Sequence, residues 1–295
     1  MTLHAILLFA QLAAPASTPV ASPTLGYMFV EHQISAVTGL PGAASAAFVP
    51  GLPPIASLIT ASHTPAAIAL PVAPEARPIF LTPYSISSLA VKGVVVGSAI
   101  SPSARYALFL TSAGFYRLSL AGDLAAETLA LPDPASTQLA LSVSDLGAVL
   151  VTTPTELYYW SDPKAQPIHL AQALTSPRFA PNSNVIAALS SGPALILLDP
   201  ATALTVQTLA SERDGLTAPT AFEFGSANSI WVTQASPAAL LHVRLTTHSV
   251  EPQTLSVPAI RALSTGVFLA DSLHIFDTNR PTPVILLLPT VPAAK

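Results

Sequence analysis

The chain of 295 residues contains no cysteine, and little of it is charged. The absence of cysteine excludes disulfide bonds, thiolate metal ligands, a cysteine nucleophile and lipid attachment through a cysteine. Charged residues make up only 9 % of the sequence, against about 25 % in typical globular domains. The 11 lysines and arginines are scattered singly, so the basic footprint of a nucleic-acid-binding protein is missing and we expect no such partner.

Motifs of established chemistry are absent as well. The sequence has no Gly-x-Ser-x-Gly elbow, no phosphate-binding glycine loop, no calcium loop and no His-Glu-x-x-His pair. Its seven histidines are not spaced as paired metal ligands, so scattered structural histidines are the simpler interpretation. We therefore predict no cofactor, no metal site and no catalytic residue set, which favours a protein that is not an enzyme.

What the sequence does contain is apolar: hydrophobic residues reach 51 %, and there are 30 prolines. The apolar residues come in short runs separated by Pro, Gly, Asn and Asp, which is typical of strands rather than helices. Runs such as 194–198 are apolar throughout, as expected for strands that are buried on both faces. Such a chain is not disordered, because disordered chains are rich in charge and poor in apolar residues.

A weak repeat runs from near residue 55 to the C-terminus. Each copy consists of four apolar runs, with polar corners after the first and the third run. Successive first corners lie about 40 residues apart, which is the period of four-stranded propeller blades. The predicted fold class is therefore all-β, a single β-propeller domain of four-stranded blades. The first corners are 62–65, 101–104, 144–147, 180–183, 225–228 and 264–266.

The number of blades depends on an opening hairpin at 26–44. We interpret this hairpin as the third and fourth strands of a further blade, followed by six full copies of the repeat. If the hairpin joins the ring, the propeller has seven blades, one of them incomplete. If it packs outside the ring, there are six. We favour seven, since a blade that mixes both chain ends would remove exposed sheet edges.

The turn Asp199-Pro200-Ala201-Thr202 between two apolar runs, with similar turns along the chain, resembles secreted bacterial β-propellers of the Tyr-Val-Thr-Asn kind. The stretch 26–44 looks like the opening of secreted propellers of environmental bacteria. The resemblance covers roughly residues 25–290 and implies a lactonase-like propeller architecture, since some relatives open lactone rings. Trp-Asp repeats are not matched, because the chain has no Trp-Asp dipeptide and no Gly-His signature.

The N-terminus predicts export from a bacterial cell. Residues 5–14 form a short apolar run, and 14–16 match a small-x-small cleavage site. We expect a signal peptide at 1–16, a flexible lead at 17–24 and the propeller at 25–295, in a secreted or periplasmic protein. The apolar run is too short to span a bilayer and no other segment reaches 18 apolar residues, so we expect no membrane span.

Charged residues are rare within the expected first strands, which line the central channel in other propellers. Only three fall there: Arg178, Glu223 and Arg261. Because side chains alternate along a strand, two flanking phenylalanines would share one face and Glu223 would point towards the channel. The charged loop 211–215 precedes the strand of Glu223, so we predict a polar binding cluster at one channel mouth. Its members are Arg178, Arg213, Asp214, Glu223 and Arg261.

Two simpler interpretations stay open beside these candidates. The charged cluster is alternatively a structural ion network that satisfies buried charge. The densest aromatic run, Tyr158-Tyr159-Trp160, lies on an expected third strand. It serves either to pack two blades together or as a platform for a carbohydrate or peptide, and packing is the simpler alternative.

Two functions follow from these features. The first is an exported, non-enzymatic binding scaffold, a monomer that presents one propeller face to an unknown protein or glycan. The second is a lactonase-like propeller hydrolase with a channel-mouth site around Glu223. We favour the scaffold, because a metal-assisted hydrolase needs several ligands that converge on the channel, and only Glu223 is placed on an inner strand.

Overall fold

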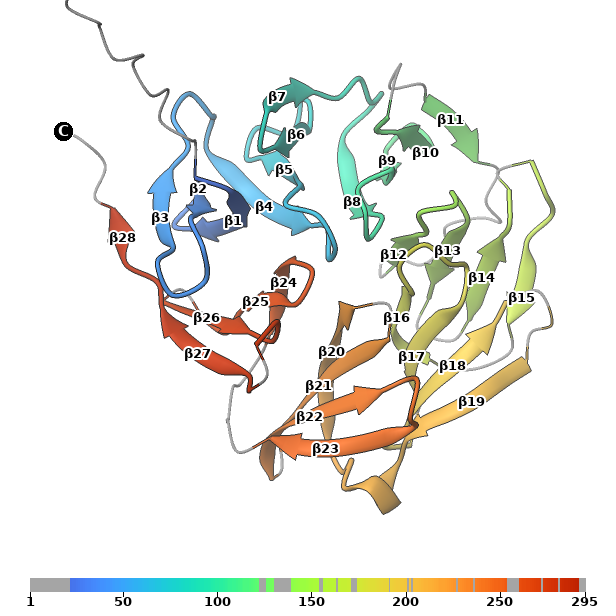
Figure 1. Ribbon diagram of the computed structural model, residues 1–295. Coiled ribbons are helices and arrows are strands. Elements are labelled where there is room, and N and C mark those ends of the chain that lie inside the picture. The colour runs from blue at the N-terminus through green and yellow to red at the C-terminus, as the bar shows by residue number, and fades with distance from the viewer. Residues whose placement is uncertain are drawn as a thin grey trace, which may run out of the picture.

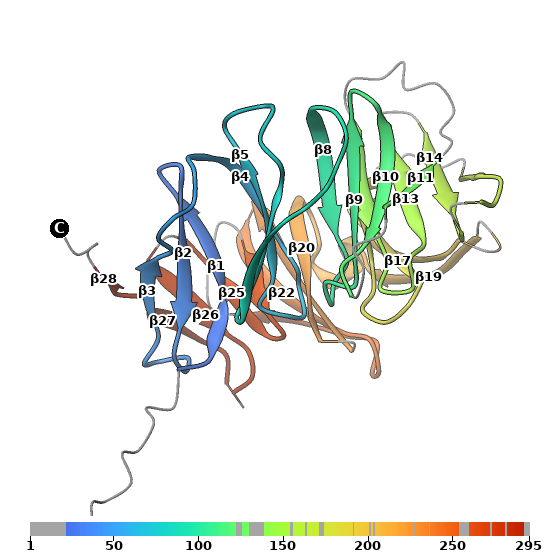
Figure 2. The ribbon, with the colours of Figure 1, turned by 90° about the horizontal axis from the view of Figure 1, so that it is seen from above.

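Seven four-stranded sheets, or blades, form a closed ring in the computed structural model of the chain (Figure 1). The strands run between the two faces of the ring (Figure 2). The prediction of an all-β propeller is therefore confirmed.

Within the described residues, the short 3-10 helix η1 (Glu212–Asp214) is the one helix, and it is not long and apolar enough to cross a membrane. The structure describes residues 22–291 except 122–125, 130–138, 154–155, 163, 171–173, 191, 201, 203, 227, 236, 254–259, 272 and 281.

In each blade the strands follow one another from the channel to the rim, and their bounds are as follows. Blade 1 contains β1 (Thr24–Val30), β2 (Gln33–Thr38), β3 (Ser45–Phe48) and β28 (Thr290–Val291). Blade 2 contains β4 (Ile55–Thr60), β5 (Ala67–Pro71), β6 (Ile79–Thr82) and β7 (Ser85–Ser88). Blade 3 contains β8 (Val95–Ile100), β9 (Tyr106–Thr111), β10 (Gly114–Ser119) and β11 (Ala126–Leu129).

The remaining four blades have the same order of strands. Blade 4 contains β12 (Ala140–Val143), β13 (Val149–Thr152), β14 (Leu157–Trp160) and β15 (Ile168–Leu170). Blade 5 contains β16 (Leu174–Phe179), β17 (Ile186–Ser190), β18 (Leu195–Asp199) and β19 (Leu204–Ala210). Blade 6 contains β20 (Pro219–Ser226), β21 (Ser229–Ala235), β22 (Ala238–Arg244) and β23 (Ser249–Gln253). Blade 7 contains β24 (Arg261–Ser264), β25 (Val267–Leu269), β26 (His274–Asp277) and β27 (Val284–Leu287).

Blade 1 closes the ring, because it contains strands from both ends of the described chain. Strand β28 pairs in parallel with β3, with Thr290 opposite Ala46 and Val291 opposite Ala47. The Ala46 N–H also donates to the Pro289 carbonyl at 3.0 Å. The propeller thus has seven blades, and the blade that the repeat pattern leaves incomplete is completed by the C-terminal strand.

The opening hairpin occupies a different place from the one expected. Strands β1 and β2 are the first and second strands of blade 1, so the interpretation as third and fourth strands is wrong. Strand β1 packs beside the inner strands β4 and β24. A tight turn at Glu31 and His32, both with positive φ, then carries the chain outward. The missing rim strand comes from the C-terminus and has only two residues, which is too short to form a recognisable sequence pattern.

The hydrophobic core lies between neighbouring blades. On one face of blade 6, Phe222 and Phe224 pack with Leu195 and other buried side chains of blade 5. On its opposite face, Trp231 and Leu240 belong to a second buried cluster shared with blade 7. Because a blade is buried on both faces, its strands carry apolar residues at nearly every position. This packing accounts for the low content of charged residues.

Serine side chains stabilise the first corners, which explains why serine recurs there. The Ser101 hydroxyl accepts the backbone N–H groups of Arg105 at 2.9 Å and Tyr106 at 3.1 Å. In the next blade, the Ser144 hydroxyl accepts the Ala148 N–H at 2.9 Å. Short hydroxyl side chains form such local bonds in turns, where the backbone groups have no strand partner.

Asp145 connects the corners of three blades. Its carboxylate is 1 % exposed. It accepts the N–H (2.7 Å) and the hydroxyl (2.9 Å) of Ser103 in blade 3 and the N–H of Asn182 (3.0 Å) in blade 5. The His63 N–H of blade 2 donates to the Pro102 carbonyl of blade 3 at 2.8 Å. Hydrogen bonds therefore link the first corners of blades 2, 3, 4 and 5 one to the next.

We predict that Asp145→Ala lowers the free energy of unfolding by about 1–3 kcal/mol, because the N–H groups of Ser103 and Asn182 lose their acceptor in a partly buried place. Urea unfolding at neutral pH measures this loss. Asp162→Ala is the matched control: Asp162 accepts the Lys164 N–H at 2.9 Å in an exposed corner, where water replaces the carboxylate. Equal losses in the two variants would contradict a special role of Asp145.

Candidate functional site

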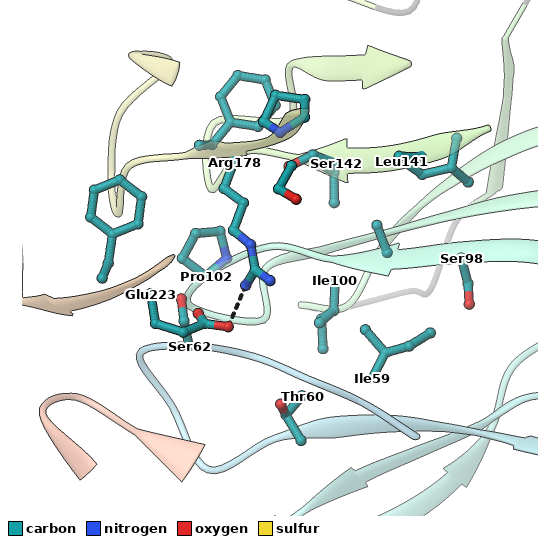
Figure 3. A pocket seen from close by; sticks show the side chains of 17 residues that line it. Ile59, Thr60, Ser62, Ser98, Ile100, Pro102, Leu141, Ser142, Arg178 and Glu223 are labelled. Atoms are coloured by element: carbon teal, nitrogen blue, oxygen red, sulfur yellow. Dashed lines mark hydrogen bonds and ion pairs between the residues drawn. The ribbon is translucent and has the colours of Figure 1, made fainter. Parts of the chain in front are cut away.

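A cavity of about 330 Å³ occupies the central channel beside the first corners. Its walls are the inner strands of blades 2 to 6, namely β4, β8, β12, β16 and β20. Arg178 and Glu223 are the charged residues among its described lining residues, and Figure 3 shows both at the cavity wall. Hydroxyl groups make up the rest of the polar lining: Thr60, Ser62, Ser98, Ser142 and Ser176.

No described residue of blades 1 and 7 lines this cavity, and blades 2 and 7 are joined by hydrogen bonds on that side of it. The Thr60 hydroxyl of β4 donates to the Ala262 carbonyl of β24 at 3.0 Å. At the corners, the Thr265 hydroxyl of blade 7 donates to the His63 carbonyl of blade 2 at 3.1 Å. These two bonds bound the cavity on that side.

A β-bulge in β16 directs Arg178 into the cavity. Thr175 pairs with Leu189 and Arg178 pairs with Ala187, so β16 carries one residue more than its partner over this interval. Within the bulge Ser176 adopts a left-handed conformation, with φ of 52°. Bulges are known to redirect a side chain near a binding site. Here the guanidinium projects across the cavity towards β20 (Figure 3).

Among the described residues, the Arg178 guanidinium is held by a hydrogen bond at one end only. Its Nη1 donates to Glu223 Oε1 at 2.6 Å, and its centre lies 5.9 Å from the ring of Phe222. The other terminal nitrogen points away from Glu223 (Figure 3). The Arg178 side chain is 45 % exposed and the Glu223 side chain 6 % exposed. Glu223 therefore serves as a buried anchor that holds an accessible arginine.

Burial raises the pKa of the Glu223 carboxyl. The charge and hydrogen bond of Arg178 and, more weakly, the charge of Arg261 oppose this rise without cancelling it. A carboxyl group with a raised pKa inside a cavity is a feature that binding sites and acid–base sites share.

Arg261 lies close enough to Glu223 for their charges to interact, but it lines a separate cavity of about 250 Å³ between blades 1 and 7. Burial lowers the pKa of Arg261, and the charge of Glu223 acts in the opposite direction. Its Nε is buried and has no hydrogen-bond partner within the described part of the chain. The structure thus brings together Arg178, Glu223 and Arg261 from the inner strands of three consecutive blades.

The structure does not bring Arg213 and Asp214 to this cluster, since neither lines the channel cavity. Both belong to η1, in the connection between blades 5 and 6. The Asp214 carboxylate accepts the N–H of Ser211 at 2.9 Å and its hydroxyl at 3.0 Å, which caps the short helix. The charge of this loop therefore has a local structural use.

Two polar groups of the site were not expected from the sequence. The buried Ser98 hydroxyl in the cavity has no hydrogen-bond partner among the described residues. In the cavity wall, the Ser62 hydroxyl lies 3.2 Å from His63 Nδ1, and burial lowers the pKa of His63 although the charge of Asp145 opposes it. No sequence signal distinguishes Ser98 from other serines, whereas Ser62 begins an aligned first corner.

The aromatic run of blade 4 packs between blades. Tyr159 and Trp160 are buried, and the ring of Tyr159 lies 6.4 Å from that of Phe179 in blade 5. Tyr158 faces the same side as Trp160, at 6.2 Å. The structure therefore supports the interpretation that this aromatic run packs two blades together. Among the described residues, no group of three or more His, Asp or Glu side chains is arranged to hold a metal ion.

Fold and cavity define the class of this protein as a seven-bladed β-propeller with a polar site in its channel. No family model matches the chain, and no curated protein resembles it in sequence. Solved structures do resemble its fold. A catalytically inactive histidine-to-alanine variant of virginiamycin B lyase from Staphylococcus aureus, with quinupristin, superposes with a TM-score of 0.52 at 12 % identity, over 91 % of this chain and 93 % of that chain.

Two further structures are similar to a comparable degree. A streptogramin B lyase gives a TM-score of 0.53 at 13 % identity, over 88 % of this chain and 91 % of that chain. PorZ, a surface component of the type-IX secretion system of Porphyromonas gingivalis, gives 0.53 at 10 % identity, over 92 % of this chain but only 38 % of PorZ. At these identities the likeness establishes the propeller fold alone.

The raised pKa of Glu223 predicts a pH-dependent contribution to stability. A carboxyl with a raised pKa binds its proton more tightly in the folded state than in the unfolded state. Its stabilising contribution is therefore present at acidic pH and is lost as the pH rises from the ordinary glutamate pKa through the raised one. The glutamine of Glu223→Gln cannot titrate. The difference in unfolding free energy, wild type minus variant, should therefore decrease as the pH rises over this interval.

Urea unfolding of both proteins between about pH 4 and pH 8 measures this difference. Glu75→Gln, at an exposed position of blade 2, is the control and should show no such trend. A difference that is constant or increases with pH at Glu223 would show that the Arg178 ion pair outweighs burial.

Proposed function

We propose that the protein is a non-enzymatic binding propeller whose channel cavity takes a small molecule bearing a carboxylate. The observation that carries the proposal is the Arg178 guanidinium, which a bulge directs into the cavity and which Glu223 holds at one end only. The free side of the guanidinium offers the planar, forked donor set that binds a carboxylate with two parallel hydrogen bonds.

The charges and the size of the cavity support an anionic small molecule. Arg178 and Glu223 balance each other when Glu223 is ionised, and Arg261, which lines the neighbouring cavity, adds a positive charge close to Glu223. The volume of about 330 Å³ lies at the lower end of the range for small-molecule sites, about 300–1,000 Å³. The hydroxyl groups of Ser142 and Ser176 also line the cavity and offer further hydrogen bonds to such a ligand.

We further propose that the protein is exported and acts as a monomer with a protein or glycan partner on one face. The support for export is the apolar run 5–14 with the cleavage pattern 14–16, together with the resemblance to secreted propellers of the Tyr-Val-Thr-Asn kind.

A second candidate is a propeller enzyme, a lactonase-like hydrolase in which Glu223 exchanges a proton with the substrate. The raised pKa of this carboxyl inside a cavity favours it, because general acids are tuned in this way. The similar fold of two lyases adds a weaker argument from fold alone.

Arg178→Ala should abolish the stabilisation of the protein by carboxylates. A ligand of the folded state raises the unfolding midpoint in a concentration-dependent way. We expect a rise with at least one of acetate, lactate, malate and citrate in the wild type, and a loss of affinity of about tenfold or more in the variant. Arg105→Ala, an exposed arginine in the corner of blade 3, is the control and should leave the rise unchanged.

The enzyme and the binding propeller differ in their response to metal ions and to Glu223→Gln. Unfolding midpoints with EDTA, calcium, magnesium, manganese or zinc, and a hydrolysis assay on simple γ-lactones, separate them. Lactone hydrolysis that Glu223→Gln abolishes would establish the enzyme. Carboxylate binding without hydrolysis supports the binding propeller, and equal carboxylate effects in Arg178→Ala and the wild type would overturn it.

A further inference from the structure

A second cavity, of about 540 Å³, lies as a groove between blades 6 and 7. Its walls are strands β20 to β23 of blade 6 and the corner of blade 7 that follows β26. It shares no lining residue with the channel cavity. We call it the blade 6–7 groove, and its principal polar side chains are His242, Arg244, Glu251, Gln253, Asn279 and Arg280.

An aromatic stack forms the inner wall of this groove. The rings of Trp231 and His242 lie parallel, 4.2 Å apart with an interplanar angle of 4°, and Phe276 meets Trp231 edge-on at 5.0 Å. The indole of Trp231 fixes the plane of the imidazole. Burial and, after it, the charge of Arg244 lower the pKa of His242, and the charge of Glu251 opposes them without cancelling the effect. The groove therefore has a flat, uncharged ring on its wall at neutral pH.

A buried hydrogen-bond donor at the base of the groove lacks an acceptor. Trp231 is 2 % exposed, and its Nε1–H has no partner among the described residues. This nitrogen lies against Gly225, where a side chain would approach it within 2.6 Å. Gly225 and Ser229 beside it also line the groove. An unsatisfied buried N–H is costly, but this one is closed off from the groove, so the polar side chains that line the groove have to make the hydrogen bonds to a ligand.

The charges of the groove are already balanced. Arg244 Nη2 donates to Glu251 Oε2 at 3.2 Å, and Arg280 Nε donates to Asp277 Oδ2 at 3.0 Å. The groove therefore attracts neither anions nor cations by net charge. The amides of Asn279 and other lining residues add donors and acceptors next to these ion pairs. Closely spaced donors and acceptors without net charge suit hydroxyl groups, because each hydroxyl both donates and accepts.

We propose that the blade 6–7 groove binds a neutral sugar unit, with one face of the sugar ring on the imidazole of His242 and its hydroxyls on the flanking ion pairs and amides. The site is separate from the channel cavity and does not depend on the function proposed for that cavity. A monosaccharide or the end of an oligosaccharide is of a size that the groove accommodates.

Titration calorimetry of the full chain with glucose, galactose, mannose, N-acetylglucosamine and maltotriose tests the proposal. We expect at least one of these neutral sugars to bind, and Arg244→Ala and Asn279→Ala each to weaken binding about tenfold or more. Arg77→Ala, an exposed arginine of blade 2, and Arg178→Ala in the channel are the controls and should leave sugar binding unchanged. The second control separates this proposal from the channel site.

Tryptophan fluorescence gives a second readout that reports the groove directly. The chain has two tryptophans, Trp160 and Trp231, so Trp160→Phe leaves Trp231 as the sole emitter. We expect the same sugar to change its emission with the same affinity as in calorimetry.

Three results would overturn the proposal. One is the absence of binding by every neutral sugar up to about 50 mM. Another is tighter binding of glucuronic acid than of glucose, since the carboxylate should add nothing in a charge-balanced groove. The third is sugar binding that survives both groove substitutions.

Discussion

Burial of the blades on both faces is the constraint on which the rest of this structure depends. The inner and middle strands of a blade have little surface exposed to solvent, so they carry apolar residues on both sides and leave most polar residues to the corners and the rim strands. Ionised groups on the inner strands are costly under this constraint unless they are paired. The inner strands therefore carry charged groups only as exceptions. These are Arg178, Glu223 and Arg261, and Glu223 interacts with both arginines.

Much of the fold can be predicted from the sequence, because the corners leave a periodic signal. Each first corner interrupts the apolar runs with residues that form local hydrogen bonds, and the spacing of these interruptions equals one blade. The blade at the chain ends cannot be predicted in the same way. Strand β28 has two residues, and it pairs with β3 from the opposite end of the described chain, so no local pattern indicates where it belongs.

The candidate site, too, can be predicted from the sequence only in part. Charge on an inner strand is visible in the sequence, and the pairing of Arg178 with Glu223 follows from neighbouring blades in a ring. The use of Asp214 in a helix cap is decided by local geometry that a charged loop does not reveal. The groove depends on a row of cross-strand neighbours, Trp231, His242 and Glu251, which pairing registers bring onto one face of blade 6. Glu223 pairs with Trp231 in the same row, so the two cavities lie at opposite ends of one line of side chains.

The pairing of β28 with β3 also sets the order in which the molecule can be completed. Blades 2 to 7 consist of strands that follow one another in the chain, so each can form once its own segment has been synthesised, whereas blade 1 keeps an unpaired edge at β3 until β28 is available. Ring closure joins segments that lie at opposite ends of the described chain, so the entropic cost of closing this long loop falls on the pairing of β28 with β3 rather than on any single blade.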